Sequence, residues 1–169
     1  MNSIKRLTFA TLAALAGLLI QPSTRADNHG RGNDDKNKGE RGEARATFTK
    51  WVIGGGPFME GVVGGDVGPG SFTGKVLQFQ DVPGPGGVTV RRIEAIYNFK
   101  GSKYSFTALV HVEQTGSGNG SKAVIIGVVT DGWRKGQAID GNYTQVDVVV
   151  MGVTSPTFKG ALEINDRKN

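Results

Sequence analysis

The sequence predicts an all-β fold: a single antiparallel β-barrel of about eight strands, after a signal peptide and a disordered polar linker. From residue 45 onward, β-branched and aromatic residues recur in short runs, and no segment keeps an apolar period of 3.6. Gly and Pro separate these runs at intervals typical of sandwiches and barrels. Glycines also lie within the runs, for example Gly61, Gly74 and Gly127, where they indicate bends or close backbone approach in a tightly coiled sheet.

Residues 1–26 have the three parts of a secretory signal. Two basic residues precede an apolar run at 7–20, and Thr24 and Ala26 place small side chains three positions and one position before a cleavage site. A membrane span needs about 20 apolar residues, so we expect cleavage rather than anchoring. The pattern of this signal predicts a bacterial protein exported to the periplasm or the extracellular space.

Cleavage would change the charge of the protein. The chain has 20 Lys and Arg residues against 15 Asp and Glu, and three of the basic residues lie within 1–26. The mature chain would have 17 basic and 15 acidic residues, a net charge of +2, so we expect no nucleic-acid partner. The chain has no Cys, which excludes disulfides, a thiol nucleophile and a thiolate metal site.

Residues 27–44 predict a disordered linker. This segment has no large apolar residue and is rich in Gly, Asn and charges of both signs, so it buries nothing that would offset its chain entropy. The barrel domain is expected over residues 45–169. Within it we predict eight strands, at residues 46–53, 58–66, 71–80, 88–99, 103–113, 122–130, 137–150 and 156–165.

The pair at 101–102, Gly-Ser, is typical of a two-residue type II′ turn. It predicts a hairpin in which Phe99 faces Tyr104 and Tyr97 faces Phe106. This register gives one apolar face and one mostly polar face. We expect the aromatic face to turn inward, as core or as the wall of an apolar pocket; an outward face would instead indicate the aromatic girdle of a membrane barrel.

Two segments are apolar on both alternations, at 123–129 and 146–151. Strands that are buried on both faces have this pattern. In a barrel, the outward Val124, Ile126 and Val128 would need a second cover. We expect a homo-oligomer interface there.

Catalytic patterns are few. His111 is the only His after residue 44, which excludes metal sites with two His ligands, and the sequence has no G-x-S-x-G motif. The Gly-rich segment 64–70 contains Asp66 and precedes a strand rather than a helix, so it indicates a turn rather than a phosphate loop. We therefore expect no catalytic set, no metal and no cofactor.

Trp133 lies between two predicted strands, beside Arg134 and Lys135. At a barrel mouth, an indole with two cations would suit an anionic or carbohydrate ligand. Large aromatic residues also fill the ends of barrels, and the sequence favours this second interpretation.

The segment AVIIGVVTDGWRKGQAIDGNY, residues 123–143, resembles part of the allene oxide cyclase and dirigent barrels. In those families an aromatic residue between glycines is followed by a small residue and another Gly; here Asp131 and Trp133 replace the usual GGTG followed by Phe or Tyr. The resemblance implies an eight-stranded antiparallel barrel with an apolar cavity, often oligomeric, and it carries over no catalytic residue. The whole domain is also similar to small exported bacterial proteins, which implies no activity.

The first functional hypothesis is a non-enzymatic binding module for a small apolar or aromatic ligand. The aromatic residues expected to contact this ligand are Tyr97, Phe99, Tyr104, Phe106 and Trp133.

Two alternatives stay open. One is a cyclase or isomerase in which a buried carboxylate assists, with Glu60, Glu94 and Asp147 as the acids within strands. The other is an outer-membrane barrel, or a structural protein that assembles through its apolar strands. Against the membrane barrel, the chain ends without a terminal aromatic residue.

Overall fold

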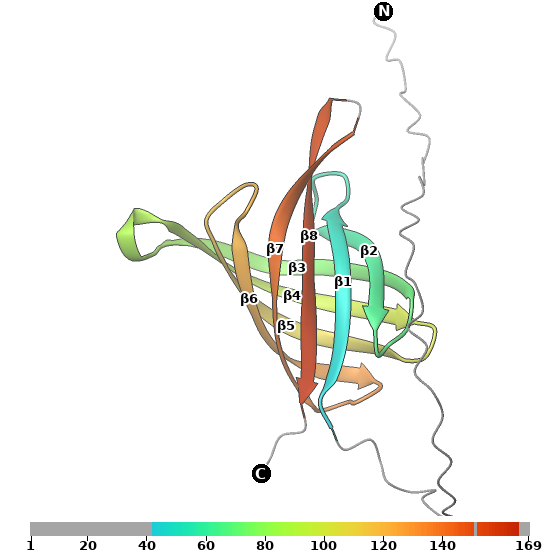
Figure 1. Cartoon of the computed structure of the whole chain (residues 1–169). Helices are drawn as coiled ribbons and strands as arrows, with labels where there is room; N and C mark the ends of the chain where they lie inside the picture. Colours follow the sequence, from blue (N-terminus) through green and yellow to red (C-terminus); the bar gives the residue numbers. More distant parts are fainter. Residues whose placement is uncertain (1–41, 151, 166–169) are drawn as a thin grey trace, which may run out of the picture. The chain divides into compact units, whose positions relative to one another are not determined.

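The eight predicted strands form one closed antiparallel barrel, in which each strand pairs with the next and β8 pairs with β1 (Figure 1). The computed structural model describes residues 42–150 and 152–165. The strands are β1 (Ala44–Val52), β2 (Phe58–Gly65), β3 (Gly70–Pro83), β4 (Thr89–Gly101), β5 (Ser105–Thr115), β6 (Lys122–Gly132), β7 (Ala138–Val150) and β8 (Val153–Asn165), with a 3₁₀ turn, η1 (Pro85–Gly87), between β3 and β4.

The expected signal peptide and the linker up to residue 41 lie outside the described residues. Ala44, expected as the last linker residue, is instead the first residue of β1 and is buried. The described residues include no helix with the length and hydropathy of a membrane span.

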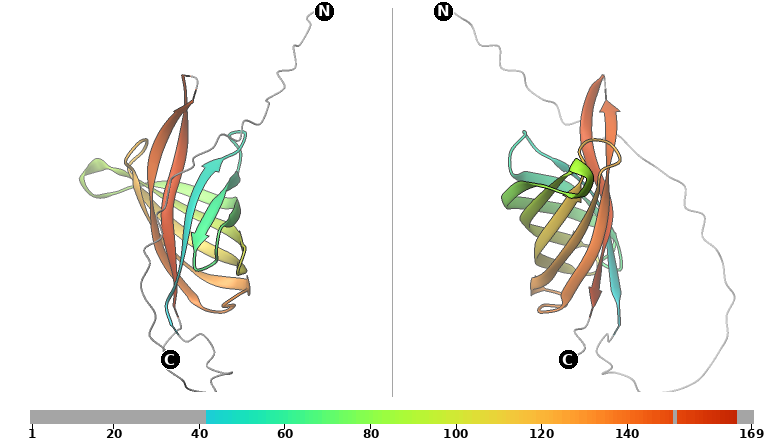
Figure 2. Two further views of the ribbon diagram at one scale, coloured as in Figure 1. Left: turned by 45° about the vertical axis from the view of Figure 1, so that its right-hand side comes forward. Right: turned by 90° about the vertical axis from the view of Figure 1, so that its left-hand side faces the viewer.

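The strands differ in length, and this difference shapes the two ends of the barrel. β3 has 14 residues and β7 has 13, whereas β2 has eight. The β3–β4 and β7–β8 hairpins therefore extend beyond the rest of the wall (Figures 1 and 2). We call the end formed by these two hairpins and by the β1–β2 and β5–β6 loops the mouth. The opposite end, formed by the β2–β3, β4–β5 and β6–β7 loops, is the closed end.

Alternation along the strands fills the barrel interior. In β1 the inward positions are Ala44, Ala46, Phe48 and Lys50, and all four are buried. Four large aromatic side chains from β1, β3 and β4 meet inside the barrel, with ring centroids 5.1 to 6.4 Å apart in the five pairs that contact. These rings belong to Phe48, Phe72, Tyr97 and Phe99. The predicted inward direction of the aromatic face is confirmed.

At two inward glycines, neighbouring backbone or side-chain atoms approach too closely for a larger residue. Gly61 on β2 pairs with Lys50, and a Cβ atom there would lie 2.1 Å from the carbonyl oxygen of Thr49. Gly74 on β3 pairs with Tyr97, and its Cβ would lie 2.9 Å from the nearest side-chain atom. An eight-stranded barrel has an interior only just wide enough for its side chains. The close approach expected at in-strand glycines is therefore found at both positions.

The predicted register of the β4–β5 hairpin is wrong by two residues. Phe99 pairs with Phe106 rather than with Tyr104, and Tyr97 pairs with Ala108 rather than with Phe106. An even displacement keeps every side chain on its predicted face, so the inward set is unchanged.

The cause of this displacement lies in the β2–β3 loop. The amide of Ser102 donates to the carbonyl of Pro69 at 2.9 Å, and the amide of Lys103 donates to the carbonyl of Val67 at 3.0 Å. These bonds hold the loop at residues 102–104, and the amide of Gly101, the last residue of β4, donates to the carbonyl of Tyr104 at 3.0 Å. Neither bond to the β2–β3 loop is visible in the local sequence pattern, because both partners lie more than 30 residues away.

The strands that are apolar on both alternations are not covered on both faces within one copy of the chain. On β6, Val124 is 62% exposed and Ile126 is 55% exposed, whereas Val128 is half-buried. On the β7–β8 hairpin, Val148 and Val149 are exposed; Met151 lies outside the described residues. A partner subunit over β6 therefore stays a prediction.

Candidate functional site

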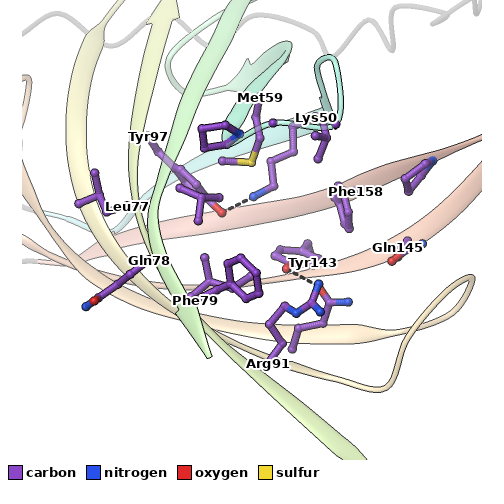
Figure 3. A pocket seen from close by; sticks show the side chains of 18 residues that line it. Lys50, Met59, Leu77, Gln78, Phe79, Arg91, Tyr97, Tyr143, Gln145 and Phe158 are labelled. Carbon is purple, nitrogen blue, oxygen red and sulfur yellow. Dashed lines mark hydrogen bonds between the residues drawn. The ribbon is translucent and has the colours of Figure 1, made fainter. Parts of the chain in front are cut away.

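A cavity of about 730 Å³ occupies the mouth half of the barrel (Figure 3). Its walls come from β1, β2, β3, β4, β5, β7 and β8 and from the β1–β2 loop. Apolar and aromatic side chains form most of this lining, including Met59, Val76, Ile93 and Phe158. The barrel is thus packed with side chains toward the closed end and hollow toward the mouth.

A β-bulge shapes the β3 wall of the cavity. The pairing of β3 with β4 shifts between Val76 and Gln78. Because the bulge inserts one extra residue, Val76 and Phe79 both line the cavity although they are three positions apart. Phe79 lies on the hairpin that extends beyond the wall and is exposed, so it forms part of the rim.

The most unusual residue of the site is Lys50, which is only 2% exposed. Its Nζ atom donates a hydrogen bond to the hydroxyl of Tyr97 (Figure 3). Aromatic rings surround Nζ, with centroids 4.0 Å away for Tyr97, 4.8 Å for Tyr143, 5.5 Å for Phe48, 5.8 Å for Phe72 and 5.9 Å for Phe158. Among the described residues, no carboxylate forms an ion pair with it.

Burial lowers the pKa of Lys50 from 10.5 to about 7, because the ammonium form loses its hydration inside the barrel. The faces of the surrounding rings and the Tyr97 oxygen favour the charged form and act in the opposite direction, but burial dominates. Near neutral pH, a substantial fraction of this side chain is therefore a neutral amine. A neutral amine has a free electron pair and can act as a nucleophile.

The two tyrosine hydroxyls of the site stay protonated. Burial raises the pKa of Tyr97 well above its usual range, and the nearby Tyr143 adds to the increase. Burial also raises the pKa of Tyr143, although the positive charge of Arg91 acts in the opposite direction. Both hydroxyls can consequently donate a proton in a hydrogen bond at physiological pH.

A chain of polar side chains runs along the β5–β7 side of the mouth. The hydroxyl of Tyr143 donates to Gln114 Oε1 at 2.8 Å, and Gln114 Nε2 donates to Ser121 Oγ at 3.1 Å. Ser121 in turn donates to Gln145 Oε1 at 3.2 Å, and Gln145 Nε2 donates to Asp147 Oδ1 at 2.9 Å. Buried polar groups need such partners, and this series of hydrogen bonds fixes the orientation of the polar side chains on this wall.

Arg91 carries the positive charge of the rim. Its guanidinium makes two hydrogen bonds to the carboxylate of Asp81, at 2.7 and 2.8 Å, and lies 5.0 Å from the centre of the Phe79 ring. The hydrogen bond from Arg91 lowers the pKa of Asp81. The rim charge is thus paired with a carboxylate, in contrast to the amine of Lys50 within the cavity.

The five residues predicted to contact a ligand are divided among three places. Tyr97 lines the cavity. Phe99 and Phe106 lie in the packed core beneath it, stacked with centroids 4.6 Å apart. Tyr104 and Trp133 stack at 4.2 Å, and both are half-buried at the closed end.

The position of Trp133 agrees with the interpretation as an end plug. Its amide donates to the carbonyl of Ser105, the first residue of β5, whereas the cavity residue Gln114 lies nine positions further along the same strand. At about 3.3 Å per residue, this places Trp133 far from the mouth.

The three candidate acids are not in the cavity lining. Glu60 is exposed, and Glu94 and Asp147 are half-buried at positions outside that lining. His111 is exposed on the outer face and pairs with Glu94 rather than with Arg92, the partner that the predicted register gives it.

Lys50 is not among the site residues predicted from the sequence. A lysine in a strand is expected to point outward, because Lys is almost never fully buried without a partner. One signal was available: Lys50 shares its alternation with Phe48, whereas the other alternation of this segment begins with Thr47 and Thr49. Lys50 must therefore point inward wherever Phe48 does.

Searches against protein-family models, characterised proteins and solved structures found no match to this chain. The fold and the site define a class of protein by themselves. It is a small antiparallel barrel with a ligand-sized cavity at one end and a buried amine in the wall of that cavity.

Proposed function

We propose that this chain is an exported, non-enzymatic binding protein that holds one small ligand with an apolar or aromatic body in the mouth cavity. The observation that carries this proposal is the cavity of about 730 Å³ with its mostly apolar and aromatic lining. Pockets for small molecules typically measure about 300–1,000 Å³ and combine apolar walls with a few polar groups.

The polar groups of the cavity suggest how the ligand is oriented. Lys50 and Tyr97 come together on one side, and Gln114 and Gln145 lie on the β5–β7 side. A ligand with one polar end would place that end against the amine and its apolar body against Met59 and the neighbouring apolar side chains. Such a ligand buries most of its surface, which supplies the binding energy.

The outer surface favours an aqueous environment over a lipid one. Arg92 and Glu113 form an ion pair at 2.9 Å across the outward face of β4 and β5. Lys159 and Glu163 are exposed on β8. A membrane barrel has an outward apolar band about 25 Å tall, and charges on this many strands would interrupt it. Export to the periplasm or the extracellular space is proposed from residues 1–26.

A pair of matched variants tests the proposal. Ile93→Trp introduces an indole into the cavity, because Ile93 lines it. Ile96→Trp makes the same change on the same strand at an outward, half-buried position. Titration with the neutral dye Nile red, followed by fluorescence, should give one-to-one binding to the wild type and to Ile96→Trp. We expect at least a tenfold loss of affinity in Ile93→Trp, about 1.4 kcal/mol.

Two outcomes would overturn the proposal. One is a wild-type protein that binds neither the dye nor a small apolar alcohol. The other is equal dye binding by the two tryptophan variants, which would place the dye outside the barrel. Circular dichroism of both variants checks that the barrel is intact.

A further inference from the structure

We propose that Lys50 binds the ligand covalently and reversibly, as an imine formed with an aldehyde group at the polar end of an otherwise apolar or aromatic molecule. This inference rests on the proposed binding function and adds the chemical class of the ligand. It assigns to Lys50 a role that ordinary packing does not require, because a buried methionine would fill the same space.

The first observation that supports the proposal is the position of the amine. Nζ of Lys50 lies in the cavity lining, and Figure 3 shows it directed toward the Tyr97 hydroxyl within the space that the other cavity side chains surround. Five aromatic rings lie within 5.9 Å of Nζ. Three of them, Tyr97, Tyr143 and Phe158, also line the cavity, so an aldehyde that reached Nζ from the mouth would have its apolar body in contact with these three rings.

The second observation that supports the proposal is that, among the residues described, no carboxylate lies beside Nζ. An ammonium group without a counterion is costly in such an environment, so the site favours the neutral amine. The pKa of about 7 agrees with this. A neutral aldehyde loses little hydration on entering the cavity, whereas a carboxylate would need several donors. Tyr143 is a poor donor for it, because its hydroxyl already donates to Gln114 at 2.8 Å.

The reaction needs no further reactant. The electron pair of Nζ attacks the carbonyl carbon, a C–N bond forms, and the carbonyl oxygen takes a proton to give a carbinolamine. The C–O bond then breaks, and the oxygen leaves as water with the two protons that the amine carried. A C=N bond remains. The Tyr97 hydroxyl, which is protonated and in contact with Nζ, can pass a proton to the leaving oxygen and take one from the nitrogen in return, so that it ends the reaction protonated.

Burial also explains why such an imine would persist. Imines hydrolyse when water reaches the C=N carbon. Lys50 is 2% exposed, and an apolar ligand that fills the cavity would exclude water from this bond. Surface lysines, which react with aldehydes too, lack this protection.

The test uses para-isopropylbenzaldehyde, an apolar aromatic aldehyde that cannot undergo conjugate addition. The mature full-length protein is incubated with a slight excess of the aldehyde and treated with sodium borohydride. We expect one modification per chain, with a mass gain equal to that of the aldehyde less one oxygen atom, and peptide mapping should place it on Lys50. Lys50→Arg should lose at least nine-tenths of this modification, and Lys159→Arg, a change at an exposed lysine, should keep it.

The matching alcohol and carboxylate separate failure of this inference from failure of the proposed function. If para-isopropylbenzyl alcohol displaces Nile red but the aldehyde leaves Lys50 unmodified after reduction, the imine proposal is overturned and the binding function stands. If para-isopropylbenzoate binds more tightly than the alcohol and only when Lys50 is present, the cavity selects anions, and the imine proposal is likewise overturned. If neither alcohol nor aldehyde binds, both proposals fail.

Discussion

The amine of Lys50 on β1 and the hydroxyl of Tyr97 on β4 meet across the interior of the barrel, although two strands separate them in the wall. Each residue pairs with a glycine on an intervening strand: Lys50 with Gly61 on β2 and Tyr97 with Gly74 on β3. Both glycines are sites of close packing: a Cβ at Gly61 would meet the backbone of β1, and a Cβ at Gly74 would meet the side chains of Met59 and Phe72. The hydrogen bond between Lys50 and Tyr97 therefore depends on the packing of four neighbouring strands of the cavity wall.

The first prediction measures the coupling between these two residues. Tyr97→Phe removes the hydroxyl that accepts the hydrogen bond of Lys50 and should destabilise the barrel by about 1–2 kcal/mol. In a Lys50→Met background, the same change should cost much less, because no amine remains to lose its partner. Urea denaturation of the four proteins gives the coupling free energy as a double-mutant cycle. Additive effects would show that the contact contributes nothing to stability.

The second prediction concerns the pH dependence of stability. The pKa of Lys50 is about 7 in the folded chain and about 10.5 when the chain is unfolded. Between these values the unfolded state binds a proton that the folded state does not, so the free energy of unfolding rises with pH in this window. Lys50 therefore lowers the free energy of unfolding progressively as pH falls from 10.5 to about 7, and this penalty is constant at lower pH. Lys50→Met removes this dependence.

We expect Lys50→Met to be more stable than the wild type at mildly acidic pH, by a few kcal/mol. The difference should shrink as pH rises through the window. Denaturant unfolding of both proteins across the pH range measures it. Lys159→Met, at an exposed position, should give no such pH-dependent difference. A constant difference between Lys50→Met and the wild type at all pH values would contradict a lowered pKa.

The third prediction separates the closed end from the cavity. Trp133 stacks on Tyr104 at 4.2 Å with an interplanar angle of 3°. Trp133→Ala should therefore destabilise the barrel by about 2 kcal/mol through lost burial and stacking, while Nile red binding at the mouth is unchanged. Thermal unfolding and dye titration measure the two effects. Trp51→Ala, at a more exposed outward position, should destabilise less.

A loss of dye affinity in Trp133→Ala, with stability unchanged, would restore the role in ligand contact that the sequence also allowed for this residue. The two readouts thus distinguish an end plug from a binding residue.

The alternation of apolar and polar residues was enough to predict all eight strands and the inward direction of Tyr97, Phe99 and Phe106. Both depend on local periodicity, which a two-residue slip does not change. The β4–β5 register depended instead on hydrogen bonds from Ser102 and Lys103 to the distant β2–β3 loop. Local turn signals carry no information about such bonds.

The candidate site was predicted less well, for a related reason. The sequence pattern indicates which aromatic residues point inward. Tertiary packing decides which of them surround a cavity and which form the core. Phe99 and Phe106 pair across β4 and β5 and stack in the buried core, outside the cavity lining. Lys50 could not be predicted as a site residue from local pattern, because its burial depends on rings from five different strands.

The last prediction concerns the outward face of β6. Val124 and Ile126 are 62% and 55% exposed on adjacent outward positions, and an exposed apolar strip of this kind is typical of an interface. If a second copy of the chain covers it, Ile126→Lys would bury an ammonium group without a partner, at a cost large enough to separate the subunits. We expect the wild type to have the mass of an oligomer by light scattering, and Ile126→Lys to have the mass of one chain.

Thr73→Lys provides the matched control, since Thr73 is exposed on β3, a strand that does not pair with β6. This variant should keep the mass of the wild type. A wild type that has the mass of a single chain at high protein concentration would remove the interface. The mouth cavity would be unaffected by that result, because Val124 and Ile126 do not line it.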